Sequence, residues 1–358
     1  MSVVDPLRSR IAQSLRRIRS AAGGTVVVLT YHRITDAPSD PLGLAVTPAC
    51  FDEHLTAFAG RYQLMNVGDV LRLLKAGRKL PRRGLAITFD DGYADALTHA
   101  CPLLEAYSAP ATLFVATGPL LSRRAFWWDE LERLVLFEKL PERLAFPEWA
   151  RITTTIAFEP DERLERTPSV RSQPNERNTK SEHHGTRETY YAELSDLLES
   201  LPIARREELL GSLRMQIVGE RSLPIDKPTL NTEQLAILAG NSLVEIGAHT
   251  VNHVKLGVLP LDAQRDEIED SKRTLQEILE REVISFSYPH GTPGSFTHET
   301  ERLVRNAGFL GAVTTGLGGP LPWGSISLDT NRYDLPRTPT EAVSTDELLT
   351  AVDRLLGV

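Results

Sequence analysis

The most restrictive feature of this chain is a repeated alternation of short apolar, β-branched runs with helical patterns. Each run has the length and composition of a buried strand, and each helical segment places apolar residues on one face. Such alternation predicts an α/β fold, in which a mostly parallel sheet is covered by helices and is either open or closed into a barrel. The predicted strands are 25–31, 85–89, 111–115, 243–247, 283–286 and 309–313, and helices are expected near 67–74, 268–279, 298–307 and 344–355.

The alternation of strand and helix patterns stops between about residues 122 and 228 and then resumes, which indicates an insertion. Within it, the segment of about 159–188 is highly charged and nearly free of large apolar side chains, so a mobile loop is expected there. Helices are predicted around that loop, at 129–140 and 189–218. The expected organisation is an N-terminal amphipathic helical segment (1–24), a first barrel part (25–121), a helical, partly disordered insertion (122–228) and a second barrel part (229–358).

Charge and hydropathy exclude several classes of partner. Forty Lys and Arg against forty-eight Asp and Glu give a net charge of −8, which argues against nucleic-acid binding. Residues 6–20 form a basic amphipathic pattern that suits packing on the chain's own domain, on a partner, or weakly on an anionic membrane surface. This start has no apolar core of a signal peptide, so the expected location is the cytoplasm, with peripheral membrane contact as an alternative.

Polar residues follow four of the predicted strands directly. In a parallel α/β fold, the carboxyl ends of the strands share one face, and that face carries the active site. The clusters are His32 after 25–31; Asp90, Asp91 and Gly92 after 85–89; His249, Thr250 and His253 after 243–247; and Tyr288, Pro289, His290 and Gly291 after 283–286.

These residue types suit metal-assisted hydrolysis of an amide or ester. Two histidines four apart and one carboxylate are a usual ligand set for a divalent metal that keeps a position for water. Successive side chains of an extended chain point to opposite sides, so one carboxylate of the Asp pair can bind metal while the other serves as a base. Alone, each motif has a simpler explanation: an Asp pair is common at a helix N-terminus, and His-x-x-x-His is common on helix surfaces.

At these residues the sequence resembles the polysaccharide deacetylases, the family with the NodB-homology domain. The resemblance lies in Thr88-Phe89-Asp90-Asp91-Gly92 and in His249-Thr250-Val251-Asn252-His253, and it covers about 25–120 and 230–340. It implies a distorted (β/α)7 barrel with the site at the carboxyl ends of the strands. The segment Phe126–Glu132, FWWDELE, resembles the start of an insertion in one branch of the family.

The resemblance implies a role for each matched residue. Asp90 would be the catalytic base, and Asp91, His249 and His253 would bind Zn²⁺ or a similar divalent ion such as Co²⁺. Tyr288 and Pro289 would lie at the substrate, and the backbone N–H of His290 would help to hold the oxyanion.

The later motifs depart from the family pattern. Ser287 stands where many members have an arginine that holds the base, so Arg337 in LPRTP is a candidate to supply that charge. The late Leu-x-x-His motif is absent, which leaves His290 and His32 to protonate the leaving amine. His32 is equally suited to a structural hydrogen bond, and His290 to substrate contact. Trp127 and Trp128 are interpreted as a sugar-stacking wall or as anchors that dock the insertion.

The sequence thus predicts a metal-dependent deacetylase that removes an N-acyl group, acetyl first, from an amino sugar in a biosynthetic pathway. A sugar nucleotide, a lipid-linked sugar or a small glycoside is preferred to an extracellular polymer, and formyl is an alternative acyl group. Two other hypotheses remain: a non-catalytic carbohydrate-binding or regulatory module on a degenerate scaffold, and hydrolysis of a non-sugar amide.

Overall fold

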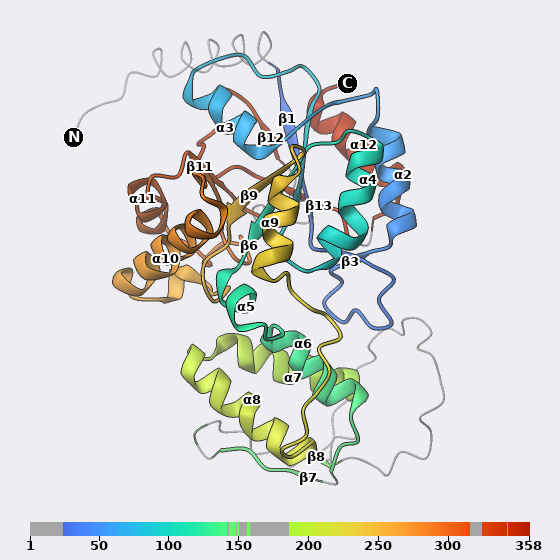
Figure 1. Cartoon of the computed structure of the whole chain (residues 1–358), viewed down its shortest axis with the longest axis vertical. Coiled ribbons are helices and arrows are strands. Elements are labelled where there is room, and N and C mark those ends of the chain that lie inside the picture. The colour runs from blue at the N-terminus through green and yellow to red at the C-terminus, as the bar shows by residue number, and fades with distance from the viewer. Residues whose placement is uncertain are drawn as a thin grey trace, which may run out of the picture. The chain divides into compact units, whose positions relative to one another are not determined.

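The computed structural model describes residues 24–141, 143–147, 149, 156–157, 186–315, 324–341 and 343–358 (Figure 1). The chain divides into two compact units, one comprising residues up to Arg124 together with Lys227–Val358, and the other Ala125–Asp226. The amphipathic pattern predicted at 6–20 lies outside the described residues, and so does the charged segment up to residue 185. The domain boundaries drawn from the sequence remain a proposal.

A parallel sheet forms the centre of the first unit. Its described strands follow the order β11-β10-β9-β6-β5-β1-β12, with β4 beside β5 and β13 beside β1. All pairs are parallel except β1 with β12. The bounds are β1 (Val26–Tyr31), β4 (Gln63–Met65), β5 (Gly84–Phe89), β6 (Ala111–Val115), β9 (Val244–Ala248), β10 (Ser285–Ser287), β11 (Gly311–Val313), β12 (Ser325–Ile326) and β13 (Thr338–Pro339).

Residues 332–339 connect the two sides of this sheet. Ala312 in β11 donates a backbone hydrogen bond to Arg332 and accepts one from Leu335. A few residues later the same segment becomes β13, which pairs with β1. The sheet is thereby curved into a distorted barrel, and the α/β barrel fold predicted from the sequence is confirmed.

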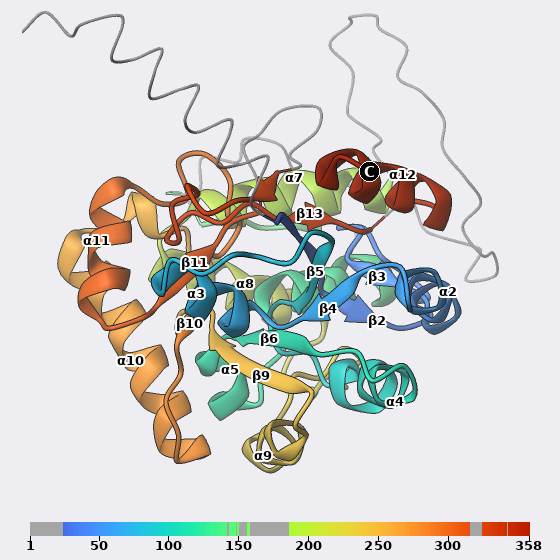
Figure 2. The ribbon, with the colours of Figure 1, turned by 90° about the horizontal axis from the view of Figure 1, so that it is seen from above.

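Most helices of this unit cover the outside of the sheet. Figure 2 shows α9, α10, α11, α12, α2 and α4 arranged around the strands. The sequence pattern did not single out α2, although it begins with a capping threonine, Thr47, followed by Pro48 in the first turn. The bounds are α2 (Pro48–Phe58), α3 (Val67–Lys75), α4 (Cys101–Ala106), α5 (Thr117–Ser122), α9 (Thr232–Gly240), α10 (Leu261–Leu279), α11 (His298–Asn306) and α12 (Thr345–Leu356), with a π-helical turn at Ala96–Ala100, a 3₁₀ turn at Leu256–Val258 and a short strand pair, β2 (Arg33–Ile34) with β3 (Ala45–Val46).

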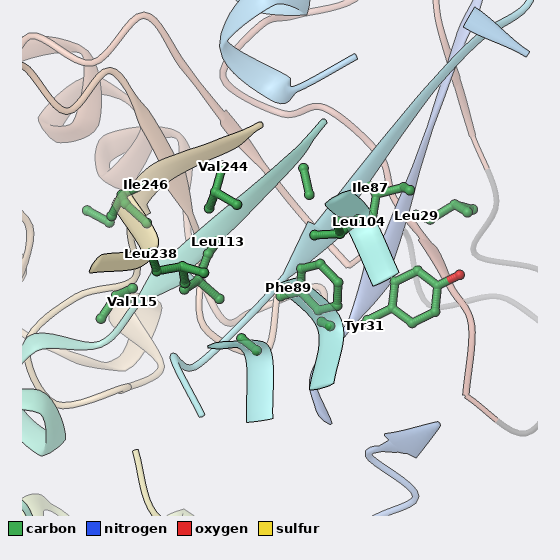
Figure 3. Packing of buried hydrophobic residues seen from close by; sticks show 14 of the residues in the cluster. Leu29, Tyr31, Ile87, Phe89, Leu104, Leu113, Val115, Leu238, Val244 and Ile246 are labelled. Atoms are coloured by element: carbon green, nitrogen blue, oxygen red, sulfur yellow. The ribbon is translucent and has the colours of Figure 1, made fainter. Parts of the chain in front are cut away.

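Alternation along the strands separates two apolar clusters. One face packs against the surrounding helices, as Figure 3 shows for side chains of β1, β5, β6 and β9 with Leu104 and Leu238. The opposite face includes Val26, Val28 and Ala86, which pack with Val67, Val70 and Leu71 of α3. This second face turns polar toward the carboxyl ends of the strands, where Thr30 and Thr88 are fully buried. The inner face of the barrel is therefore apolar beside α3 and polar at the carboxyl ends of the strands.

The second unit has its own apolar core, formed by side chains such as Leu131, Tyr190, Leu194 and Leu210. The helical pattern predicted at 189–218 is two helices, because Pro202 has no N–H to continue the first. The bounds are α6 (Trp127–Glu132), a π-helical turn at Arg133–Phe137, β7 (Arg143–Leu144), β8 (Ile156–Ala157), α7 (Arg187–Ser200) and α8 (Ile203–Ile217).

In the part of the chain that the structure describes, none of the helices has both the length and the apolar character needed to cross a bilayer.

Candidate functional site

Asp90 and Asp91 diverge at the end of β5 because the backbone turns between them. Asp90 continues the strand and lies in phase with Ala86 and Thr88 on the inner face. Asp91 has φ = 71° and Gly92 has φ = 88°, so the chain passes through the left-handed region at both residues. A glycine tolerates that conformation without a steric penalty, whereas an aspartate does so at a cost. The result is two adjacent, buried carboxylates that face different neighbours.

Asp91, His249 and His253 bring three potential metal ligands together. The Oδ1 atom of Asp91 lies 3.2 Å from Nε2 of His253 and 3.5 Å from Nε2 of His249. One ligand atom from each residue lies within 4.8 Å of the other two. His249 lies just after the end of β9, and His253 lies in the turn that follows. Because β9 pairs with β6 and β6 pairs with β5, all in parallel, this end of β9 lies near the end of β5.

The hydrogen bond made by His249 shows that this group suits a cation. Its Nδ1 lies 2.8 Å from the carbonyl oxygen of Ser287, which can only accept, so Nδ1 carries the proton. In the neutral ring, Nε2 then presents a lone pair toward Asp91. Oδ1 of Asp91 is buried and accepts no aligned hydrogen bond from the described residues. A ring lone pair directed at a carboxylate oxygen is an arrangement that a bound divalent ion would satisfy.

The ionisation states of the group also suit a metal. Burial raises the pKa of Asp91, but His253, His249 and His32 outweigh it and hold that pKa well below its usual value. Burial lowers the pKa of His253, and Asp91 only partly offsets this effect. At neutral pH the carboxylate is therefore ionised and the imidazole is neutral, which are the forms that bind metal.

Unfavourable backbone conformations concentrate at this site. Left-handed φ values occur at the non-glycine residues Asp91 (71°), Thr250 (63°), His253 (51°) and His290 (62°). Each such residue costs of order 1–3 kcal/mol and persists only where surrounding contacts hold it. The clustering indicates that the fold sets the direction of these particular side chains.

Arg337 holds Asp90 through a fully satisfied buried pair. Its Nη1 donates to Oδ1 of Asp90 at 2.8 Å, and its Nη2 donates to Oδ2 at 2.6 Å. The remaining N–H groups reach the Thr314 carbonyl at 3.0 Å, Thr88 Oγ1 at 3.1 Å and Ser287 Oγ at 3.0 Å. All five guanidinium donors thus have acceptors, and the side chain is 0% exposed. Arg337, which directly precedes β13, is thus placed where it can supply the charge for which the sequence made it a candidate.

Arg337 also determines the protonation state of Asp90. Burial raises the pKa of this carboxyl, but Arg337, His249 and His32 outweigh burial and bring the pKa below its usual value. Ser287 Oγ donates a further hydrogen bond to Oδ2 at 3.2 Å. Asp90 is therefore an ionised carboxylate at neutral pH, with Nε2 of His249 at 3.8 Å from its Oδ2.

His32 pairs with Glu341, a residue that the sequence pattern did not single out. Nδ1 of His32 donates to Oε1 of Glu341 at 2.7 Å. Burial lowers the pKa of His32, but Glu341 outweighs it, with smaller contributions from Asp91 and Asp90, and the pKa rises to about 9. Glu341 lies 309 positions along the chain from His32, so no local spacing connects the two residues.

Three residues that were predicted to contact substrate follow β10 directly, and the structure places them in different surroundings. The side chain of Tyr288 is 0% exposed, stacks on Phe296 and donates to the Tyr333 carbonyl at 3.0 Å. This contradicts the expectation that Tyr288 contacts substrate, because its ring belongs to the core. Pro289 is buried, whereas His290 is half-buried with its ring 5.1 Å from that of His253. Burial, and then His253, lowers the pKa of His290.

Trp127 and Trp128 belong to the second unit. Trp128 is 5% exposed and stacks on Phe126 with 4.4 Å between ring centroids. Trp127 contacts Trp128 edge-on, and the guanidinium of Arg206 lies 5.0 Å from its ring centre. These contacts fit anchoring within the second unit, and the sugar-stacking alternative stays a prediction.

The His249→Ala variant tests the ligand assignment directly. We expect it to weaken Zn²⁺ binding by about 100-fold or more, since loss even of a partner outside the ligand set costs roughly 10–100-fold. Affinity is measured by competition with a chromophoric chelator. His298→Ala is the matched control, because His298 is 93% exposed and far from Asp91 in sequence. Zinc affinity equal to that of the unmodified chain would contradict the assignment.

The fold and the site together define a class: an α/β barrel with an arginine-held carboxylate beside a potential Asp-His-His metal group at the strand ends. A polysaccharide deacetylase family model matches residues 77–136 and 224–312. Over these residues the chain is similar to the polysaccharide deacetylases, and the resemblance inferred from the motifs is confirmed.

Individual relatives are distant. The poly-beta-1,6-N-acetyl-D-glucosamine N-deacetylase of Escherichia coli is 28% identical over 86 residues, which cover 24% of this chain and 13% of that protein. The chain thus spans only a small part of that relative. Among solved structures, the deacetylase PplD of Streptococcus pyogenes has a TM-score of 0.55 at 18% identity, over 92% of this chain and 99% of that one. IcaB of Ammonifex degensii has a TM-score of 0.54 at 16% identity, over 92% and 97%. These structures support the fold.

Proposed function

We propose that this chain is a metal-dependent hydrolase that removes an N-acetyl group from an amino sugar. Zn²⁺ is the proposed ion, with Co²⁺ as a substitute. One observation carries the proposal: an ionised carboxylate, Asp90, is held at both oxygens by Arg337 next to the group of Asp91, His249 and His253.

The chain's own residues divide the chemistry between them. A divalent ion held by Asp91, His249 and His253 would polarise the acyl carbonyl and lower the pKa of a bound water. A carboxylate offers about four acceptor positions, and Arg337 and Ser287 occupy three of those on Asp90. The remaining position, on Oδ1, is available to take the proton of the attacking water. We propose that the backbone N–H of His290 helps to hold the oxyanion.

We propose His32 as the group that protonates the leaving amine. A general acid must carry its proton at the working pH. His32 does so because its pKa is raised to about 9, mainly by Glu341 acting against burial. His290, the other candidate, has a lowered pKa and is neutral near pH 7.

The Glu341→Gln variant tests this role through the pH dependence of kcat/KM. A general acid with a raised pKa is active below that pKa and loses its proton as the pH rises through it. Removing the Glu341 charge lowers the pKa of His32, so we expect the alkaline limb of the profile to move to lower pH. The control is His290→Gln, which should leave the limb in place. An unmoved limb in Glu341→Gln, or a moved limb in the control, would exclude His32 as the acid.

The substrate class is also a proposal. An amino sugar carried by a nucleotide, a lipid or a glycoside fits the expectation of a biosynthetic enzyme, and N-formyl sugars require the same chemistry. The name of the Escherichia coli relative adds β-1,6-linked N-acetylglucosamine oligomers as candidates. A cytoplasmic location and a weak membrane contact through residues 6–20 are kept as parts of the proposal.

A non-catalytic carbohydrate-binding module is the main alternative. It would leave the buried pair of Asp90 and Arg337 without a purpose, since burying two charges costs several kcal/mol per ion before pairing. Hydrolysis of a non-sugar amide would use the same residues, because base, metal and water do not select the acyl acceptor.

The deciding experiment measures acetate and formate by proton NMR from a panel of N-acyl substrates. The panel holds sugar nucleotides, lipid-linked sugars, glycosides, β-1,6-linked oligomers and non-sugar amides. The protein is stripped of metal and then reloaded with Zn²⁺ or Co²⁺, with Asp90→Asn as the blank. We expect release that needs the metal and is absent from the blank. Release from the non-sugar amides alone would overturn the sugar assignment. If neither acetate nor formate is released while metal is bound, the result would favour the binding module.

A further inference from the structure

The turn between the two histidines has a backbone that is unfavourable by itself. Thr250 has φ = 63° and His253 has φ = 51°, and neither residue is a glycine. Within the turn, the His253 N–H donates to Thr250 Oγ1 at 3.0 Å. A turn of this kind keeps its shape only where groups outside it satisfy its remaining backbone atoms.

The carbonyl groups of the turn are held from α5. The Thr117 N–H donates to the Thr250 carbonyl at 3.1 Å, and the Gly118 N–H donates to the Val251 carbonyl at 2.7 Å. A Cβ atom at position 118 would lie 2.7 Å from that carbonyl oxygen. Glycine is therefore needed there for the close approach of the two backbones.

The N–H groups of the turn are held from α10 by one carboxylate. Oε2 of Glu267 accepts from the Val251 N–H at 2.8 Å and from the Asn252 N–H at 2.9 Å. Oε1 accepts from the Asn252 side-chain amide at 2.6 Å. Glu267 is 8% exposed, and hydrogen bonds to an ionised acceptor are about twice as strong as neutral ones.

We propose that Glu267 is a positioning residue for the metal group, because it holds the 250–253 turn in the form that directs His253 toward Asp91. The inference rests on the metal assignment of the proposed function. Without the carboxylate, two part-buried N–H groups would lose their acceptor, and Thr250 and His253 could relax out of the left-handed region. The Nε2 atom of His253 would then leave its place 3.2 Å from Asp91.

The test compares Glu267→Ala and Glu267→Gln with a control on the same helix. Gln264 is 2% exposed, and its side chain donates to the Leu259 carbonyl and accepts from Thr300 Oγ1, neither of which belongs to the 250–253 turn. Gln264→Ala therefore removes a buried polar group of α10 and leaves the turn intact. The measurements, made on the full chain without substrate, are Zn²⁺ affinity by chelator competition, the visible spectrum of bound Co²⁺, and the unfolding midpoint of the metal-free protein.

We expect Glu267→Ala to weaken Zn²⁺ binding by about 10–100-fold and to change the Co²⁺ spectrum. Glu267→Gln should fall between it and the unmodified chain, since an amide oxygen can still accept from both N–H groups. Gln264→Ala should lower the unfolding midpoint of the metal-free protein but leave Zn²⁺ affinity unchanged. If Glu267 only stabilised the fold, Glu267→Ala would behave like Gln264→Ala, with a lower unfolding midpoint and unchanged Zn²⁺ affinity.

Unchanged Zn²⁺ affinity in Glu267→Ala, or an equal loss in Gln264→Ala, would overturn the proposal. If Glu267→Ala does not fold, Glu267→Gln decides the matter, and unchanged affinity there overturns the proposal as well. An unmodified chain that binds no Zn²⁺ would instead overturn the metal assignment itself. The failure of this inference and the failure of the proposed function are therefore distinguishable.

Discussion

Replacing Asp90 by asparagine is expected to lower kcat by roughly 10²–10⁴-fold, the usual contribution of a general base, while bound Zn²⁺ per chain stays unchanged. The amide keeps the shape of the carboxylate but cannot accept a proton from water. Asp90 is also distinct from the proposed ligands, since Arg337 holds both of its oxygens and its Oδ2 lies 3.8 Å from Nε2 of His249. Acetate release and metal content are measured on the same sample.

The matched variant is Asp91→Asn, which replaces the neighbouring carboxylate by an amide. We expect it to lose metal, because Oδ1 of Asp91 is the atom on which both histidine Nε2 atoms converge. Loss of metal in Asp90→Asn, with retention in Asp91→Asn, would mean that the two aspartates have exchanged roles. Because an amide nitrogen would face Nη2 of Arg337, the folded fraction of Asp90→Asn must be determined before rates are compared.

Replacing Arg337 by methionine is expected to reduce the free energy of unfolding at pH 7 by about 3–5 kcal/mol. That is the usual cost of removing one partner from a buried ion pair, since the other charge remains without compensation. Arg337 is 0% exposed and makes five hydrogen bonds, so the substitution also leaves Thr88, Ser287 and the Thr314 carbonyl without this donor. Urea unfolding measures the effect, and Arg302→Met on the exposed surface of α11 is the control, expected to lie within about 0.5 kcal/mol.

The same variant has a pH signature. In the unmodified chain the pKa of Asp90 is depressed, so its contribution is present above the unfolded pKa and is lost as the pH falls through the folded pKa. Without Arg337, burial raises that pKa, so the variant becomes less stable as the pH rises. The deficit should therefore be larger at pH 7 than at pH 4, and the acid limb of kcat/KM should move to higher pH. An equal deficit at both pH values would show that lost packing, rather than lost charge, causes the destabilisation.

The strand pattern could be read from the sequence because burial on both faces produces continuous apolar runs. The predicted strands 25–31, 85–89 and 111–115 correspond to β1, β5 and β6. The short strands β4, β12 and β13 lacked such a signal, since none of them lies within a longer apolar run. Their pairing is decided by tertiary contacts, and it is β13 that brings Arg337 beside β1.

The residue types of the site were likewise determined by local sequence. The Asp90–Asp91 pair and the two histidines follow strands whose carboxyl ends must meet in a parallel sheet, so their convergence follows from chain order and strand polarity. Their partners could not be inferred in this way. Glu341 lies 309 positions from His32, and Arg337 lies 247 positions from Asp90. Glu267 is 15 residues from Asn252. A glutamate is ordinary in an amphipathic helix, so the sequence pattern did not mark this residue.

The sequence by itself determined the α/β class, the family motifs and the groups able to bind metal and move protons, because these depend on residue type and on short spacings. Only the tertiary structure decided which charges are paired, which backbone turns are held in the left-handed region, and that the Tyr288 ring belongs to the core. The physical reason is that the pKa and the direction of a side chain depend on neighbours that are close in space. The distance between two residues in space cannot be read from their positions along the chain.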